Sequence, residues 1–129
     1  MTTPTIPAEL QASASIQKRI TIALASNGAV AVDASTGSYF LVTLAANATS
    51  TVISNGTTGQ IITLKYLQDA TGSRTYVWPT NCKFGTGVTT GTTVAAGAPS
   101  DGTASKGSAV TFHFDGTNWN EISRAVAVG

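Results

Sequence analysis

The stretch Gly59–Pro79, GQIITLKYLQDATGSRTYVWP, contains the clearest structural pattern in the chain. Its first half alternates with a period of two, so that Ile62, Leu64 and Tyr66 share one face of a β-strand. This half is also rich in β-branched and aromatic residues, which favour strands. Because one face is apolar and the other is mixed, we expect one side of the strand to pack on a core.

The second half of the stretch predicts a reversal and a returning strand. The segment Asp69–Ser73 holds side chains that bond the local backbone and a glycine, Gly72, that can take a positive φ. The chain resumes as Arg74–Trp78 and meets a proline, which has no amide hydrogen for a ladder and suits a strand end. We therefore expect a long hairpin whose returning strand anchors the core through Tyr76 and Trp78.

The same patterns predict further strands on both sides of this stretch. The turn sequences Asn27-Gly28 and Asp115–Asn118 each separate two such runs and indicate hairpins. A spacing of about eight to twelve residues between strands is typical of sandwiches and barrels. The expected strands are Ile20–Leu24, Ala29–Asp33, Ser38–Leu44, Thr49–Ile53, Ser108–Phe114 and Trp119–Arg124.

These elements predict an all-β fold, a single antiparallel β-sandwich of jelly-roll type over residues 19–129, preceded by an extended N-terminal arm. The glycine-rich segment Asn81–Lys106 is expected to be a long excursion with short strands near Val88–Val94. The apolar tail Ala125–Gly129 suits either an extension of the last strand or a contact with a neighbour. The expected core residues are Phe40, Val42, Ile62, Leu64, Tyr76, Trp78, Phe112 and Phe114.

Composition limits the classes of partner. Charged residues make up 10% of the 129 residues, and the formal net charge is +1. A low-charge surface of hydroxyls and small side chains favours a subunit that works inside an assembly. Since no basic cluster exceeds the pair Lys18-Arg19, nucleic acid and membrane surfaces are not expected partners.

The N-terminus and the single cysteine bear on the compartment. No apolar run approaches the ~20 residues of a spanning helix, and MTTPTIPAEL lacks the regions of a signal peptide. Synthesis in a cytoplasm is therefore expected. Cys82 has no second thiol for an internal disulfide or a metal site, so we interpret it as a part-buried structural residue.

Residues 1–18 differ from the rest of the chain because two prolines favour extended geometry and large apolar residues are few. One interpretation is a frayed end. The other is an arm that becomes ordered on a neighbouring subunit, reaching about 60 Å at ~3.3 Å per residue. The candidate partner-binding residues are Ile6, Leu10, Ile16, Lys18 and Arg19.

Catalytic, cofactor and metal sites are not predicted. His113 is the only histidine, and it alternates with Phe112 and Phe114, so it is expected on the outer face of its strand. Ser108 or Ser123 with Asp115 would complete a triad on paper, but the sequence contains no nucleophile elbow. The six carboxylates are isolated, and most fall in turns.

Two longer segments carry a family resemblance. The order QDATGSRTYVWP, a Gly/Thr-rich insert and then VTFHFDGTNWNEISRA resembles small β-sandwich modules of tailed-bacteriophage virion proteins, over roughly Ala29–Arg124. Such modules occur in tail fibres, in appendages and as capsid decoration (cement) proteins. The resemblance implies a non-enzymatic structural subunit, commonly a trimer. The most specific matching residues are Gln68-Asp69, Gly72-Ser73-Arg74, Trp78-Pro79 and Phe114–Trp119.

Three functions remain open at this point. The leading expectation is a decoration protein that binds the major capsid protein on the surface of the phage head and stabilises it. The alternative is a tail-fibre or baseplate appendage that contacts the host surface. A carbohydrate-binding module or an enzyme is a distant third, because Trp78 and Trp119 lie in strands among large apolar groups and are expected in the core.

Overall fold

The computed structural model describes residues 19–85 and 102–129. Within these ranges the chain forms strands, one 3₁₀ turn (Ala34–Thr36) and no α-helix, which confirms the all-β class. The N-terminal arm and the expected strands near Val88–Val94 lie outside the described residues. The strands are β1 (Arg19–Ala23), β2 (Ala29–Asp33), β3 (Tyr39–Leu44), β4 (Ser50–Ser54), β5 (Ile61–Gln68), β6 (Cys82–Lys83), β7 (Gly107–Phe114) and β8 (Trp119–Val128).

The strands belong to two sheets. The larger sheet has the order β1-β3-β5-β7-β8-β6, and the smaller sheet pairs β2 with β4. From β1 to β5 the chain alternates between the two sheets. The parallel pairs are β1 with β3, β2 with β4 and β3 with β5. The chain from β1 to β5 therefore winds around the core, and two successive strands, one in each sheet, make one turn. We call this wound segment the coil.

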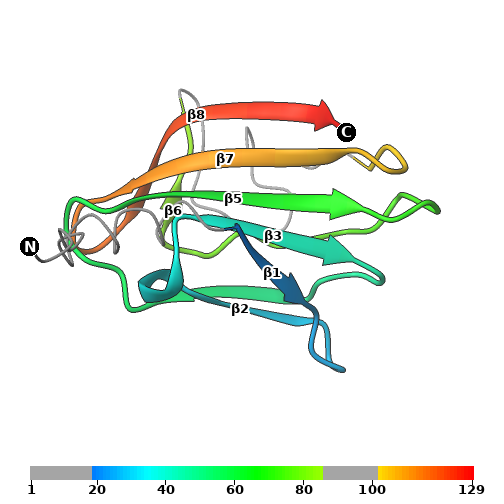
Figure 1. The fold of residues 1–129 in the computed structure, drawn as a ribbon, viewed down its shortest axis with the longest axis horizontal. Coiled ribbons are helices and arrows are strands. Elements are labelled where there is room, and N and C mark those ends of the chain that lie inside the picture. Colours follow the sequence, from blue (N-terminus) through cyan, green and yellow to red (C-terminus); the bar gives the residue numbers. More distant parts are fainter. Residues whose placement is uncertain (1–18, 86–101) are drawn as a thin grey trace, which may run out of the picture.

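In the second half of the larger sheet the β5–β7 and β7–β8 pairs are antiparallel, and the short β6 pairs in parallel with β8. β7 lies between β5 and β8 and pairs antiparallel with both, and register shifts interrupt the β7–β8 ladder. Figure 1 shows β5, β7 and β8 running side by side, with β1 and β2 at the opposite end of the molecule from β8. The expectation of an antiparallel fold throughout was wrong for the coil and for the β6–β8 pair, and correct for the β5–β7 and β7–β8 pairs.

Two of the expected hairpins were wrong. The strands before and after Asn27-Gly28 exist, and Gly28 has a φ of 83°, but β1 and β2 pair in different sheets. Likewise β5 does not pair with Arg74–Trp78, which forms no regular strand. A turn sequence predicts that the chain reverses, and it does not decide whether the next strand joins the same sheet or crosses to the other one. The last hairpin, β7–β8, was predicted correctly.

The core is aromatic and receives side chains from both sheets. Tyr66 stacks on Tyr76 with ring centroids 4.4 Å apart, and Trp78 meets Phe112 edge-on at 5.9 Å. Every expected core residue is buried except Phe114, which is half-buried and stacks on Trp119 at the margin. The smaller sheet adds Val30 and Val32.

The smaller sheet is also tied to the larger one by a buried polar contact. The hydroxyl of Tyr66 on β5 bonds Thr51 on β4 and donates to the carbonyl of Val77 at 3.1 Å. Because a buried hydroxyl without a partner is costly, these bonds let a tyrosine occupy the core. Burial raises the pKa of the Tyr66 phenol.

Candidate functional site

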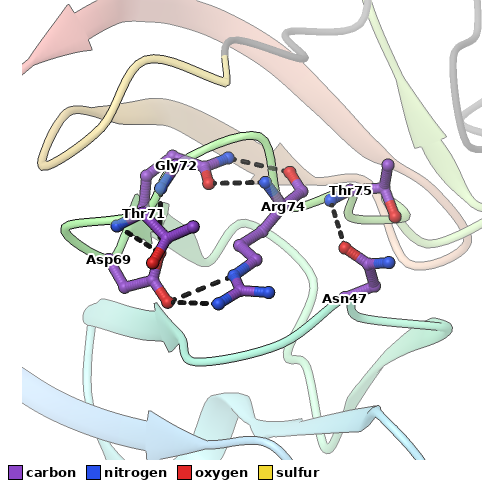
Figure 2. A network of polar contacts seen from close by, with 7 residues as sticks. Asn47, Asp69, Thr71, Gly72, Arg74 and Thr75 are labelled. Atoms are coloured by element: carbon purple, nitrogen blue, oxygen red, sulfur yellow. Dashed lines mark hydrogen bonds and ion pairs between the residues drawn. The ribbon is translucent and has the colours of Figure 1, made fainter.

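A cluster of polar contacts surrounds Asp69, directly after β5 (Figure 2). One carboxylate oxygen accepts from the backbone N–H of Thr71 at 3.2 Å and of Gly72 at 3.0 Å. The other oxygen accepts from Nε and Nη2 of Arg74 at 3.1 and 2.9 Å. Hydrogen bonding by the Arg74 guanidinium lowers the pKa of Asp69, so the carboxylate is fully engaged in shaping this turn.

Gln68 supports the same turn from inside. Its side chain is 2% exposed, its Oε1 accepts from the Arg74 N–H at 2.9 Å, and its Nε2 donates to the Arg74 carbonyl at 2.8 Å. The amide therefore makes the two bonds to Arg74 that a neighbouring strand would otherwise supply.

The segment after the turn is held to the β3–β4 connection. The Thr75 N–H donates to Oδ1 of Asn47 at 3.0 Å, and the Ala48 N–H donates to the Thr75 carbonyl at 2.8 Å (Figure 2). These bonds place Tyr76 and Trp78 in the core without a regular ladder. The cluster therefore positions Tyr76 and Trp78 in the core, and its polar atoms form hydrogen bonds within the chain.

The triad drawn from the sequence with Ser108 is not assembled, and Asp115 is not available to the version with Ser123. Ser108 is fully buried on the inner face of β7, whereas His113 lies on the outer face opposite Ile61. Asp115 accepts from the N–H groups of Asn118 at 2.7 Å and Thr117 at 2.8 Å. Its carboxylate is committed to the β7–β8 turn and is not aimed at the imidazole.

The other titratable groups are dispersed. Among residues 19–85 and 102–129, no group of three or more His, Cys, Asp or Glu side chains is placed to hold a metal ion. Asp33 caps the 3₁₀ turn and accepts from Ser35 and Asn55, and these bonds lower its pKa. Cys82 is fully buried, which raises the pKa of its thiol. In the described part of the chain, no helix has the length and hydropathy needed to cross a bilayer.

The candidate attachment surface is the outer face of the larger sheet, defined by the side chains that share a face with Ile61. Ile61 is 51% exposed, and Thr63 and Leu67 on the same strand are half-buried. The Thr63 and Thr111 hydroxyls share a hydrogen bond of 2.8 Å across β5 and β7. By register, this outer face also holds Arg19, Thr21, Ala23, Tyr39, Leu41, Thr43, Lys65, Lys83, Gly107, Ala109, His113, Asn120, Ser123, Ala125 and Val128.

The composition of this outer face matters for association. It contains no carboxylate on any described strand, and its cationic side chains are Arg19, Lys65 and Lys83. A broad, hydroxyl-rich and weakly charged surface has little charge to desolvate when another surface covers it. The outer face is therefore suited to contact with another protein chain.

Of the arm residues proposed to bind a partner, only Arg19 falls in the described part of the chain, where it is the exposed first residue of β1. Ile6, Leu10, Ile16 and Lys18 lie outside it, so their role as a partner-binding set stays a prediction. The sequence pattern placed Ile61, Thr63 and Leu67 correctly on one face. The apolar tail extends β8 to Val128, and β8 exposes Ile122, Val126 and Val128.

Comparison with known protein families, curated proteins and solved structures finds no match.

Proposed function

We propose that this chain is a non-enzymatic structural protein of a tailed-phage virion, and that it decorates the head by binding the major capsid protein. The resemblance in QDATGSRTYVWP and VTFHFDGTNWNEISRA supports this proposal. The geometry that supports it best is the outer face of the larger sheet, broad and without a carboxylate on its described strands. On this proposal the protein is made in the bacterial cytoplasm and resides on the capsid surface.

The architecture proposed with this function is a jelly-roll-like β-sandwich. Two sheets contribute to one core, and Val30 and Val32 of β2 join the cluster that holds Phe40 and Val42 of β3. A contact between sheet faces of this kind is how sandwiches bury their inner surfaces. A rigid body of this type presents its outer strands as fixed surfaces for neighbouring chains.

Self-association as a trimer is part of the same proposal. Ile61, Thr63 and Leu67 would meet their equivalents or other strands around an axis, where hydroxyls and small apolar groups can pack closely. The N-terminal arm would then reach the capsid, with Ile6, Leu10 and Ile16 as separate apolar contacts and Lys18-Arg19 at its base. No cofactor or metal enters this function.

Protein quantification in purified virions tests the location. A decoration protein is expected at a copy number comparable to that of the major capsid protein. An abundance far lower, in line with tail components, would replace the decoration role with that of a tail-fibre or baseplate appendage.

Removal of the arm tests the attachment. A chain that lacks residues 2–17 is expected to keep its β-sheet circular dichroism and to bind undecorated heads several times more weakly than the full chain. The matched control is Val52→Asp, which alters the exposed side of the smaller sheet, leaves the arm and the outer face intact, and is expected to leave binding unchanged. Equal binding by the truncated and full chains would move the attachment surface from the arm to the sheets.

A further inference from the structure

The coil described above has an open end. β1 is the edge strand of the larger sheet, and β2 has only β4 as a neighbour in the smaller one. β1 and β2 contact each other, so their unpaired edges face the same end of the molecule, the lower end in Figure 1. Within the described residues no strand pairs with either edge. An unpaired edge presents free N–H and C=O groups that readily accept another strand.

The core is also less covered at this end. Ile20 and Ile22 on β1 are half-buried, whereas their register partners Phe40 and Val42 on β3 are fully buried. A further strand beside β2 would add cover at this end for Ile20 and Ile22, whereas Val30 and Val32 on β2 are already buried. The chain segment nearest to this end in sequence is residues 1–18, which join β1 at Arg19.

The spacing of the coil shows where an earlier turn would fall. Parallel partners lie 24 residues apart between β3 and β5 (Tyr39 with Thr63) and 21 apart between β2 and β4 (Ala29 with Ser50). The turn nearest the N-terminus, from β1 to β3, has a spacing of 20 residues, since Arg19 pairs with Tyr39. At the same spacing, the segment that corresponds to β2 is Glu9–Ser13. The linker from Ser13 to β1 then has the same five-residue length as the linker 34–38 between β2 and β3.

The residues at this spacing repeat the burial pattern of β2 and its 3₁₀ turn. The inward positions Val30, Val32 and Ala34 are buried, and their counterparts 20 residues earlier are all apolar. The outward Ala31 is exposed, and its counterpart is polar. The counterparts of Val30, Ala31, Val32, Ala34 and Ser35 are Leu10, Gln11, Ala12, Ala14 and Ser15.

Only one register suits this segment, because successive side chains on a strand point to opposite faces of the sheet. A shift of one residue would turn Glu9 and Gln11 inward and Leu10 outward, which buries a carboxylate and exposes the largest apolar group. The pairing that hides Leu10 and Ala12 is therefore the one that also preserves the linker length.

We propose that Glu9–Ser13 pairs in parallel with β2 of the same chain and adds a third strand to the smaller sheet. The same chain is the donor because a five-residue linker keeps the segment at a high effective concentration beside β2. This inference does not rest on the virion function. On this inference Leu10 packs with Ala12 on the chain's own core in place of contacting the capsid, and Ile6 and Ile16 are left for a partner.

A disulfide across the proposed pair tests the register. In the double variant Gln11→Cys/Ala31→Cys the two thiols would face outward as direct neighbours, within the Cα separation that a disulfide requires. Mild oxidation is expected to remove both free thiols and to leave a monomer on a non-reducing gel. Cys82 stays in place because it is fully buried.

The matched control is Ala12→Cys/Ala31→Cys, whose first thiol would face inward and so should not react. Equal oxidation of the two double variants would overturn the register. Disulfide-linked dimers of the first variant would overturn the choice of donor, because the segment would then come from another copy. Absence of any disulfide in the first variant would overturn the pairing itself.

Hydrogen exchange provides a second, independent test in the full chain. Leu10→Asp is expected to speed exchange of the β2 amides that do not bond to β4 by about tenfold or more, because the added strand is lost. Gln11→Asp introduces the same charge on the outward side and is expected to leave these amides unchanged. If both substitutions have the same effect on β2, the proposal fails.

Discussion

At the scale of the residue, Phe112 shows how closely the aromatic core is packed. It is fully buried on β7 and meets Trp78 and Phe84 with ring centroids 5.9 and 5.8 Å apart. Phe112→Ala is expected to lower the free energy of unfolding by about 3 to 5 kcal/mol, because it removes buried apolar surface and leaves a cavity. Chemical denaturation measures this, with Thr111→Ala on the outer face as control. Equal losses in the two variants would contradict the assignment of faces.

The lowered pKa of Asp115 predicts how the stability of the fold depends on pH. Hydrogen bonds from the Asn118 N–H, the Asn120 side chain and the Thr117 N–H lower its pKa from 3.8 to about 2. As the pH falls, the unfolded chain therefore takes up this proton before the folded chain does. The contribution is fully present above the ordinary pKa and is lost as the pH falls from about 4 to about 2.

Asp115→Asn isolates this contribution, because the amide oxygen can still accept the turn bonds but does not titrate. The variant is expected to lose less stability than the original chain between these pH values, measured by thermal unfolding at each pH. Since Asp69 and Asp33 also have lowered pKa values, some loss remains in the variant. Parallel pH profiles for the two chains would contradict the role of Asp115.

At the scale of the element, Gln68 connects β5 to the irregular segment that follows it. Gln68→Leu keeps a side chain of similar size and leaves the N–H and the carbonyl of Arg74 without their partner. Each buried polar group without a partner costs about 1 to 3 kcal/mol. We therefore expect a loss of this size in urea denaturation, and no loss for Thr71→Ala, whose side chain is exposed. A neutral Gln68→Leu would show that the side chain does not hold this segment.

Element positions followed well from local pattern. Alternation placed β5, β7 and the buried faces of both, because side-chain direction along a strand follows a period of two. The two-residue strand β6 was not predicted, since it is too short for a period and depends on pairing with β8 at Trp119. Gly72, with a φ of 73°, was predicted as a turn residue because this backbone region suits glycine.

At the scale of the whole molecule, the outer face predicts self-association. Light scattering is expected to show a concentration-dependent trimer, and Ile61→Asp is expected to shift it toward monomer by placing a carboxylate on a surface whose described strands have none. Val52→Asp is the control, since Val52 is also exposed, at 61%, but belongs to the smaller sheet. Only monomer at micromolar concentration would argue against a stable free trimer, and equal effects of both variants would argue against this outer face.

The amino-acid sequence by itself determined the all-β class, most strand positions, the aromatic core and the turns at Asp69 and Asp115, because these depend on alternation and on local backbone chemistry. It also placed Ile61, Thr63 and Leu67 on one face. Only the tertiary structure decided that β1, β3 and β5 pair in parallel and that β2 and β4 form a separate sheet. The physical reason is that the partners in these parallel pairs lie 20 or more residues apart. Which strands pair therefore depends on how the two sheets share one core.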